Sequence, residues 1–212
     1  MRKDRDSVVR YSAGDRFVHW TVALAFVLLA LSGLALFQPG YFYLSELFGG
    51  GTWSRILHPF IGIVLVLFFA QMAVRMWRWN RLTPNDGKWL AGIRDVVVNR
   101  EDRVPAPGRY NAGQKLLFWT MVTTIALLLL SGFVIWRPWF APYFSPELWR
   151  VAVVVHAVAA FVIIAGIIVH IYASIWTVGS IPAMVRGTVS RGWARQHHGA
   201  WYDEISKKEP GA

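Results

Sequence analysis

The sequence predicts an all-α integral membrane protein, a bundle of four transmembrane helices. Of its 212 residues 55% are hydrophobic, the mean hydropathy is +0.39, and four long stretches contain no charged residue. A hydrocarbon core about 30 Å thick needs roughly 20 apolar residues per helix, and only helices or closed barrels satisfy their backbone groups in lipid. A net charge of +10 would suggest nucleic acid as a partner of a soluble chain. The positive hydropathy argues against such a partner.

The uncharged stretches set the helices in order. Between successive charged residues they contain 29, 19, 21 and 35 residues, enough for one crossing each. The helices are predicted near residues 17–37, 56–77, 115–136 and 150–176, within a single membrane domain that spans residues 1–212. The apolar part of the first helix is too long for a cleaved signal peptide, so no targeting segment is evident.

The distribution of Lys and Arg predicts the orientation. The N-terminal tail to Arg16 carries five, the middle loop from Arg75 to Lys115 nine, and the C-terminal tail from Arg186 five. Because 19 of the 22 basic residues lie on one side, the positive-inside rule places both termini and the middle loop in the cytoplasm. The basic segment after Ile181 is expected to lie at the lipid headgroups.

The two halves of the chain resemble each other in sequence. At an offset of 99 residues Ser32-Gly33 aligns with Ser131-Gly132, and at an offset of 98 His58 aligns with His156. One interpretation is that the halves are two copies of a helical hairpin. The other is that any two Leu-rich helices look alike and that Ser-Gly pairs ease helix packing.

Four of the six histidines lie in or at the ends of the predicted helices, and an ionisable side chain in lipid marks a functional site by default. From the predicted orientation, His58 and His156 lie near the outer surface and form the outer pair. His19 and His170 lie toward the inner surface and form the inner pair. The remaining two, His197 and His198, are expected to be solvated in an exposed tail.

Paired neutral imidazoles from facing helices indicate two bis-His b-type haems. The chain has no Cys, which excludes cysteine-ligated zinc, iron–sulfur clusters and covalently attached haem. Small residues at these levels either leave room for a flat macrocycle or serve ordinary close packing. These residues are Gly33, Gly62, Gly132 and Gly166.

Several longer motifs resemble one known family. They are RYSAGDRFVHW (10–20), ILHPFIG (56–62), GRYNAGQKLLFW (108–119), SGFVIWRPWFAPYFS (131–145), VHIYASIW (169–176) and HHGAWY (197–202). Across nearly its whole length the chain resembles the gamma subunit, cytochrome b556, of the respiratory formate dehydrogenases of the N and O type. The resemblance implies a bacterial inner-membrane, multi-pass subunit of anaerobic respiration. Such a subunit carries electrons from an iron–sulfur beta subunit on the outer side through two b haems to menaquinone or ubiquinone near the cytoplasm.

The resemblance also implies particular site residues. The outer haem carries over to His58 and His156, and the inner haem to His19 and His170. The quinone site carries over to Asn111, Gly113 and Gln114, with His170 bridging haem and quinone. Amide side chains and an imidazole supply hydrogen-bond partners for quinone carbonyls. An N-cap of the third helix is the alternative role for Asn111 and Gln114, and both roles are compatible.

The resemblance implies partners as well. Formate is oxidised elsewhere, on a molybdenum or tungsten alpha subunit reached through the beta subunit, so no catalytic residue for that reaction is expected on this chain. Three such heterotrimers assemble in the family. The aromatic outer loop 137–150 is expected to face the beta subunit, although a membrane aromatic belt explains its Trp and Tyr equally well.

Three alternatives remain at this point. A cytochrome b subunit of a hydrogenase or another oxidoreductase would share the histidine layout. A non-redox membrane anchor would leave the layered histidines unexplained. A metal transporter would normally bring carboxylates into the bilayer, and the four predicted helices contain none.

Overall fold

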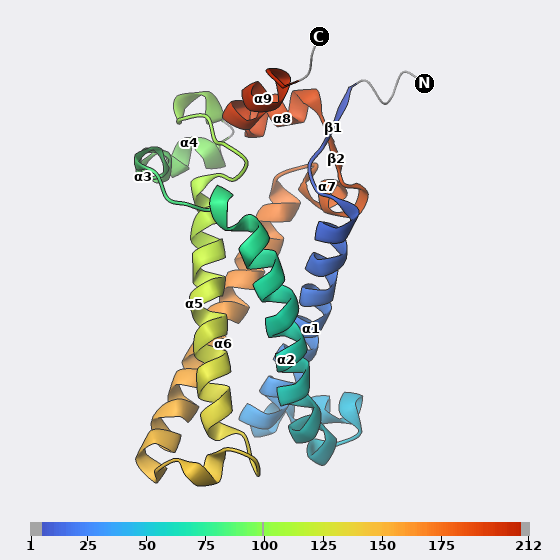
Figure 1. Cartoon of the computed structure of the whole chain (residues 1–212), viewed down its shortest axis with the longest axis vertical. Coiled ribbons are helices and arrows are strands. Elements are labelled where there is room, and N and C mark those ends of the chain that lie inside the picture. The colour runs from blue at the N-terminus through green and yellow to red at the C-terminus, as the bar shows by residue number, and fades with distance from the viewer. Residues whose placement is uncertain (1–5, 99, 209–212) are drawn as a thin grey trace. The chain divides into compact units, whose positions relative to one another are not determined.

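A computed structural model describes residues 6–98 and 100–208 of the chain (Figure 1). The described chain is mostly helical and divides into two compact units. We call Phe17–Val74 with Thr120–His170 the bundle unit, and Met1–Arg16 with Arg75–Trp119 and Ile171–Ala212 the loop unit. The division falls inside the long helices, so each of them contributes residues to both units.

Four helices are long and apolar enough to cross a membrane. They are α1 (Ala13–Phe37), α2 (Gly51–Met76), α5 (Ala112–Ile135) and α6 (Pro146–Trp176). Each ends within one residue of its predicted end. Each begins about one helical turn before the approximate starts predicted at 17, 56, 115 and 150.

The early starts have a local cause in three of the helices. Before α1, the Ser12 hydroxyl oxygen accepts from the Asp15 backbone N–H at 3.1 Å, and the Asp15 carboxylate accepts from the Ser12 backbone N–H at 3.1 Å. Asn111 caps α5 in the same reciprocal way, and the Ser145 hydroxyl accepts from a backbone N–H of α6. Polar caps satisfy the free N–H groups of the first turn, so the helices extend beyond their uncharged stretches.

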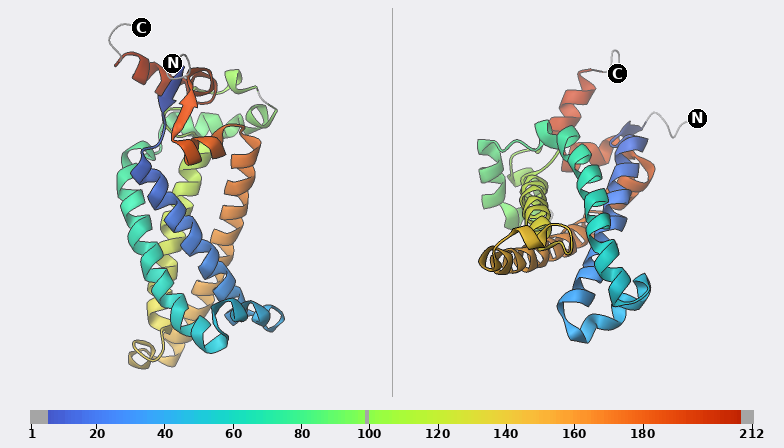
Figure 2. Two further views of the ribbon diagram at one scale, coloured as in Figure 1. Left: turned by 90° about the vertical axis from the view of Figure 1, so that its right-hand side faces the viewer. Right: turned by 60° about the horizontal axis from the view of Figure 1, so that its bottom comes forward.

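The bundle unit is held together by a narrow apolar core. The buried residues of this core come from all four helices: Ala25, Leu65, Phe69, Ile125 and Ile163. Figure 2 shows the helices of this unit packed side by side. Many of their other apolar side chains point outward, among them Phe161, which is 74% exposed. Outward apolar side chains are what a lipid surrounding requires.

Two short connections join the bundle helices at the same end of the unit. The segment η1 (Pro39–Phe48) links α1 to α2, and η4 (Ala141–Tyr143) lies between α5 and α6. Figure 1 shows both at the bottom of the view. The loop 137–150 is therefore on the same end of the bundle unit as the loop between the first two helices.

The loop unit contains a feature that the all-α prediction omitted. Strand β1 (Ser7–Val9) pairs antiparallel with β2 (Thr188–Ser190) and ties the two ends of the described chain together. Three-residue strands are too short to show an alternating pattern in the sequence. Next to β2, Gly187 has φ 89° and its carbonyl accepts from the backbone N–H groups of Arg10 and Tyr11 at 2.8 and 3.0 Å. A side chain at this positive φ would be strained.

The rest of the loop unit consists of short helices. They are η2 (Trp77–Trp79), α3 (Pro84–Ala91), α4 (Ile93–Val97), η3 (Glu101–Arg103), α7 (Ser180–Arg186), α8 (Arg191–His197) and α9 (Gly199–Ser206). One core cluster joins the strands to the C-terminal helices through Val8, Val189, Ala183, Ala194 and Trp201. The N-terminal tail, the middle loop and the C-terminal tail, which the sequence places on one side of the membrane, thus belong to one compact unit.

The expectation of a solvated His197-His198 tail was wrong. His198 is only 2% exposed, and His197 Nδ1 lies 2.9 Å from Glu101 Oε1. The physical reason is that the tail folds back as α8 and α9 and buries Ala194 and Trp201 with the strands. The apolar residues of the C-terminal tail are therefore part of a hydrophobic core and are not solvated.

Candidate functional site

The outer pair is assembled in the bundle unit from α2 and α6. The ring centroids of His58 and His156 are 6.3 Å apart, with an interplanar angle of 61°. The inner pair is assembled from α1 and α6, where the centroids of His19 and His170 are also 6.3 Å apart, at 55°. The structure therefore brings together both pairs that the sequence predicts.

The spacing of the rings fits a single metal ion between them. A metal–imidazole bond is about 2.0–2.1 Å long, and the ring centre lies roughly 1.1 Å behind the nitrogen, so two trans imidazoles have centroids about 6.3 Å apart. Both pairs match this distance. Among the described residues no cluster of three or more His, Cys, Asp or Glu could hold a metal ion.

A serine orients each histidine of the outer pair. His58 Nδ1 lies 2.8 Å from Ser32 Oγ, and His156 Nδ1 lies 3.0 Å from Ser131 Oγ. Each serine hydroxyl donates to a backbone carbonyl four residues earlier in its own helix, Leu28 at 2.8 Å and Leu127 at 2.5 Å.

The use of the serine proton determines the histidine tautomer. Because the hydroxyl hydrogen of each serine is engaged by its own helix, the serine oxygen accepts from the histidine Nδ1–H. The other ring nitrogen, Nε2, then carries a lone pair and can ligate a metal. Fixing one imidazole nitrogen by a hydrogen bond is how proteins orient histidine ligands.

The glycine after each serine leaves room for the ring. A Cβ on Gly33 would lie 3.4 Å from His58 Cε1, and a Cβ on Gly132 would lie 3.2 Å from His156 Cε1. The repeated Ser-Gly therefore has the same partner in both hairpins, a histidine of the following helix. This geometry favours the interpretation of two related hairpins over chance similarity of Leu-rich helices.

His19 of the inner pair has no such serine among the described residues. His19 Nδ1 is buried, and no described residue forms a hydrogen bond with it. His19 instead packs edge-on against the Trp20 ring at 5.3 Å. Equal ring spacing is thus reached in the two pairs with different supports.

The predicted quinone residues lie together at the start of α5, in the loop unit: Asn111 directly precedes the helix, and Gly113 and Gln114 are in its first turn. Gln114 N–H donates to Asn111 Oδ1 at 2.9 Å, and Asn111 N–H donates to Gln114 Oε1 at 3.0 Å, so both residues cap α5. A Cβ on Gly113 would lie 3.7 Å from the Trp89 ring. His170 belongs to the bundle unit, so its place in the same site remains a prediction.

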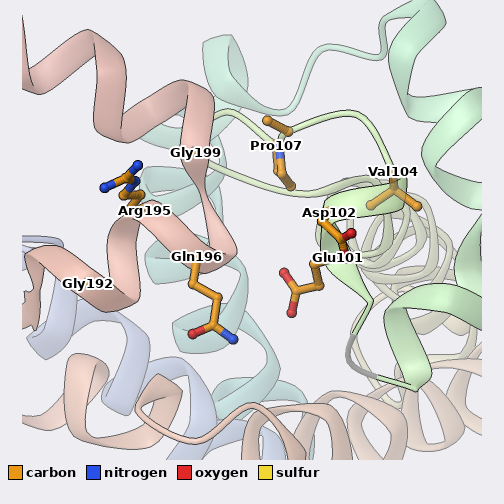
Figure 3. Close-up of a pocket in the computed structure, with 9 residues that line it drawn as sticks. Glu101, Asp102, Val104, Pro107, Gly192, Arg195, Gln196 and Gly199 are labelled. Atoms are coloured by element: carbon orange, nitrogen blue, oxygen red, sulfur yellow. The ribbon is translucent and has the colours of Figure 1, made fainter.

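A hollow of about 570 Å³ lies elsewhere in the loop unit. Figure 3 shows the Glu101–Pro107 loop on one side of it and α8 with the start of α9 on the other, with the Glu101 side chain extending toward α8. Its other charged lining residues are Asp102 and Arg195. No residue predicted to bind haem or quinone lines it.

Four apolar helices that carry two facing histidine pairs define a membrane-embedded cytochrome b class of protein. The chain belongs to the prokaryotic cytochrome b561 family, whose pattern matches residues 10–187. This membership implies haem b as the cofactor type and a bacterial membrane as the location.

Within this family, the chain is similar to cytochrome b556 subunits of formate dehydrogenases. The formate dehydrogenase cytochrome b556(fdo) subunit of Escherichia coli K12 is 45% identical over 205 residues, covering 97% of this chain and 96% of the relative. The nitrate-inducible cytochrome b556(Fdn) subunit of the same organism is 43% identical, covering 95% and 93%. The formate dehydrogenase cytochrome b556 subunit of Haemophilus influenzae is 37% identical, covering 95% and 86%. The resemblance inferred from the motifs is confirmed.

The sequence pattern does not reveal the roles of some structurally important residues. In the sequence, Ser32 and Ser131 mark a repeat, and their alignment next to that of His58 and His156 is the one signal that they contact histidines. Arg10 and His198 were visible only as parts of longer motifs. Their partners lie 99 and 90 residues away in the chain, Arg109 for Arg10 and Gly108 for His198, so no local pattern pointed to them.

Proposed function

We propose that the chain is the diheme cytochrome b subunit of a membrane-bound formate dehydrogenase and that it passes electrons to quinone. The observation that carries the proposal is the pair of histidine pairs, each with centroids 6.3 Å apart, in a chain similar to formate dehydrogenase cytochrome b556 subunits. A non-redox anchor has no use for either pair.

The four histidines would hold two b haems, one haem at the outer pair and one at the inner pair. When bound, these haems would carry single electrons between the two faces of the membrane. The protein contributes orientation: Ser32 and Ser131 hold the outer imidazoles with Nε2 available, and the apolar helices exclude water from both levels.

The quinone would bind at Asn111, Gly113 and Gln114, and the family resemblance adds the inner ligand His170 to this site. The caps of α5 use the amide oxygens of Asn111 and Gln114 and leave their NH₂ groups without a partner among the described residues. Those NH₂ groups are donors suited to a quinone carbonyl. Capping and quinone binding therefore use different atoms of the same side chains.

The basic loop unit would lie on the cytoplasmic side of the inner membrane, with both termini. Packing of its three chain segments in one unit supports their location on a common side, and the charge distribution supports the cytoplasm. Electrons would then arrive from outside while protons for quinone, menaquinone or ubiquinone, would come from the cytoplasm. Quinone reduction would separate charge across the membrane.

The electron donor would be an iron–sulfur beta subunit docked at the outer end, where the aromatic loop 137–150 lies. Formate oxidation would take place on a molybdenum or tungsten alpha subunit joined through beta, and three heterotrimers would assemble. Three rings at the end of α5 and in this loop pack together, with Phe133 and Phe140 stacked at 3.8 Å and Trp136 edge-on to Phe140 at 5.6 Å. A rigid aromatic surface of this kind suits a protein interface.

The test is a dithionite-reduced minus oxidised spectrum of the purified chain with a pyridine haemochrome assay. We expect b-type haem at two per chain. One haem per chain would show that a histidine pair is wrongly assigned. A folded chain that takes up no haem when haem is supplied would overturn the proposal in favour of an anchor. Co-purification of iron–sulfur and molybdenum or tungsten subunits tests the partner assignment separately.

A further inference from the structure

Three consecutive backbone carbonyls just before the predicted quinone residues each accept a hydrogen bond from a distant part of the loop unit. The carbonyl of Pro107 accepts from the Ala200 backbone N–H at 3.1 Å. The carbonyl of Gly108 accepts from His198 Nδ1 at 2.9 Å, and that of Arg109 accepts from Arg10 Nη2. The segment 107–109 is therefore fixed along its whole length by the two ends of the described chain.

Arg10 is an unusual donor because it is a charged side chain that is only 1% exposed. Four aromatic rings surround its guanidinium, with that of Trp201 nearest at 4.5 Å. The others are Tyr11, Tyr110 and Trp193, at 5.5, 5.5 and 6.0 Å. Among the described residues no carboxylate pairs with Arg10. Ring faces and carbonyl oxygens thus stabilise the charge and hold the side chain rigidly.

His198 links Arg10 to the same segment. Arg10 Nη2 lies 3.2 Å from His198 Nε2, while His198 Nδ1 bonds the Gly108 carbonyl. Burial, with the positive charge of Arg10, lowers the pKa of His198 to about 3, so the ring is neutral at physiological pH. A neutral ring donates from Nδ1 and accepts at Nε2, which is the arrangement both contacts require.

Arg109 and Arg10 each donate a hydrogen bond to the backbone carbonyl of the other. Its Nη2 donates to the Arg10 carbonyl at 2.5 Å, and its guanidinium lies between the rings of Trp79 at 4.6 Å and Trp201 at 5.8 Å. The start of α9 lies close to the loop that precedes Pro107, because a Cβ on Gly199 would be only 3.3 Å from the Cβ of Ala106. Figure 3 shows Pro107 and Gly199 at this junction.

A second anchor lies on the other side of the quinone residues. Lys115 Nζ is 2.9 Å from both carboxylate oxygens of Asp86, and Asp86 also accepts from the backbone N–H of Thr83 at 2.6 Å. Lys115 and Asp86 are each 8% exposed. Residues 111–114 are thus held between the carbonyl contacts at 107–109 and an ion pair at 115.

We infer that Arg10 and His198 are positioning residues for the quinone site, fixing the backbone from which Asn111 and Gln114 present their NH₂ groups. The inference rests on the proposed quinone function. Neither residue is required to touch the quinone; each acts through the segment 107–109. Binding groups displaced by about 1 Å lose much of their effect, so loosening this segment weakens quinone binding without removing a haem ligand.

The test compares Arg10→Lys, which keeps the charge but not the planar pair of donors, with His198→Leu and His198→Gln in the complex purified with its partner subunits. Formate-dependent reduction of decylubiquinone is expected to show a KM raised about tenfold in Arg10→Lys and His198→Leu, with kcat within about twofold. His198→Gln, which can both donate and accept, is expected to recover most of the KM. Reduction of benzyl viologen and the haem content should be unchanged.

Arg195→Gln is the matched control, because it removes an exposed charge from α8 and contacts none of the three carbonyls. Hydrogen exchange of residues 107–116 supplies a readout that is independent of quinone, and faster exchange is expected in Arg10→Lys and His198→Leu only. Unchanged KM in both variants, while Asn111→Ala raises it, would overturn the positioning role. An Asn111→Ala variant with normal KM would instead overturn the quinone assignment itself, and with it the inference.

Discussion

The outer and inner histidine pairs have the same ring spacing and different supports. In the outer pair, each ring is held by a serine of the preceding helix, and the two halves of the pair come from equivalent places in the repeated hairpins. In the inner pair, His19 Nδ1 has no hydrogen-bond partner among the described residues. The comparison shows that a facing pair of imidazoles can be preserved with or without the symmetric hydrogen bonds.

The difference has a consequence for chemistry. An imidazole whose second nitrogen is fixed has one orientation and a more basic ligand atom, which makes the outer pair the more rigid of the two. The inner pair is free of that constraint on at least one ring. It is also the pair that the family resemblance places next to quinone, where His170 would contact both the haem and the quinone.

Substitution of a predicted haem-ligating histidine is expected to have the largest effect on either pair. His156→Ala is expected to lower the haem content from two per chain to one, because a single imidazole holds haem poorly. His170→Ala is expected to lower it to one as well, with loss of the inner haem. The pyridine haemochrome assay measures both. His197→Ala, in the loop unit, is the control and should retain two haems; retention of both haems in His156→Ala would contradict the outer assignment.

The serines give the second test, which should separate the two pairs. Ser32→Ala and Ser131→Ala each remove the partner of one outer ring and are expected to weaken haem binding at the outer site about 10- to 100-fold. Haem titration of the apoprotein measures the affinity, and the inner site should be unaffected.

Thr124→Val is the matched control for the serine variants. The Thr124 hydroxyl donates to the Thr120 carbonyl at 2.7 Å, as the serines do to theirs, but it contacts no histidine. An equal loss of affinity in Thr124→Val would mean that helix packing, and not ring orientation, is affected by these hydroxyls.

The sequence predicted the parts of the molecule that follow from long patterns. Charge-free stretches placed the four helices and their ends, and the predicted membrane depth paired His58 with His156 and His19 with His170. It missed the first turn of each helix, because capping in α1, α5 and α6 depends on polar side chains that lie among charges. It also missed Arg10 and His198, because their contacts join segments about 90 or more residues apart.

His198 provides a contrast with the paired histidines, since the protein occupies both of its nitrogens. Its pKa is lowered to about 3 by burial first and then by Arg10, well below the value of about 6.5 for an unfolded chain. The folded loop unit therefore binds fewer protons than the unfolded one. The contribution of His198 to the stability of the loop unit is fully present above pH about 6.5. It is lost progressively as the pH falls toward 3, which lowers the free energy of unfolding by a few kcal/mol in all.

Hydrogen exchange of the loop unit at pH 7 and pH 5 tests this expectation. Opening should be easier at pH 5 in the unmodified chain, and His198→Gln should show a smaller change because it has no titrating ring. Haem content should be two in both proteins. Haem loss specific to His198→Gln would contradict the distinction between a histidine with both nitrogens engaged and one that ligates metal.

The glycines should give the smallest effect and the finest comparison between the two hairpins. A Cβ at Gly132 would lie 3.2 Å from His156 Cε1, closer than ordinary contact, whereas one at Gly33 would lie 3.4 Å from His58 Cε1. Gly132→Ala is therefore expected to tilt the ring and destabilise the protein by about 1 kcal/mol, with Gly33→Ala smaller. A shift of the outer-haem signal in electron paramagnetic resonance, together with Tm, measures both.

Gly62→Ala sets the baseline for this series, because its Cβ would meet only Leu29 Cδ2 at 4.0 Å. The ordering Gly132, Gly33, Gly62 follows from the three distances alone. If all three variants shifted Tm equally and left the haem signal unchanged, the serine and the glycine of the repeated Ser-Gly would have separate roles. The serine would orient the ring, and the glycine would serve helix packing only.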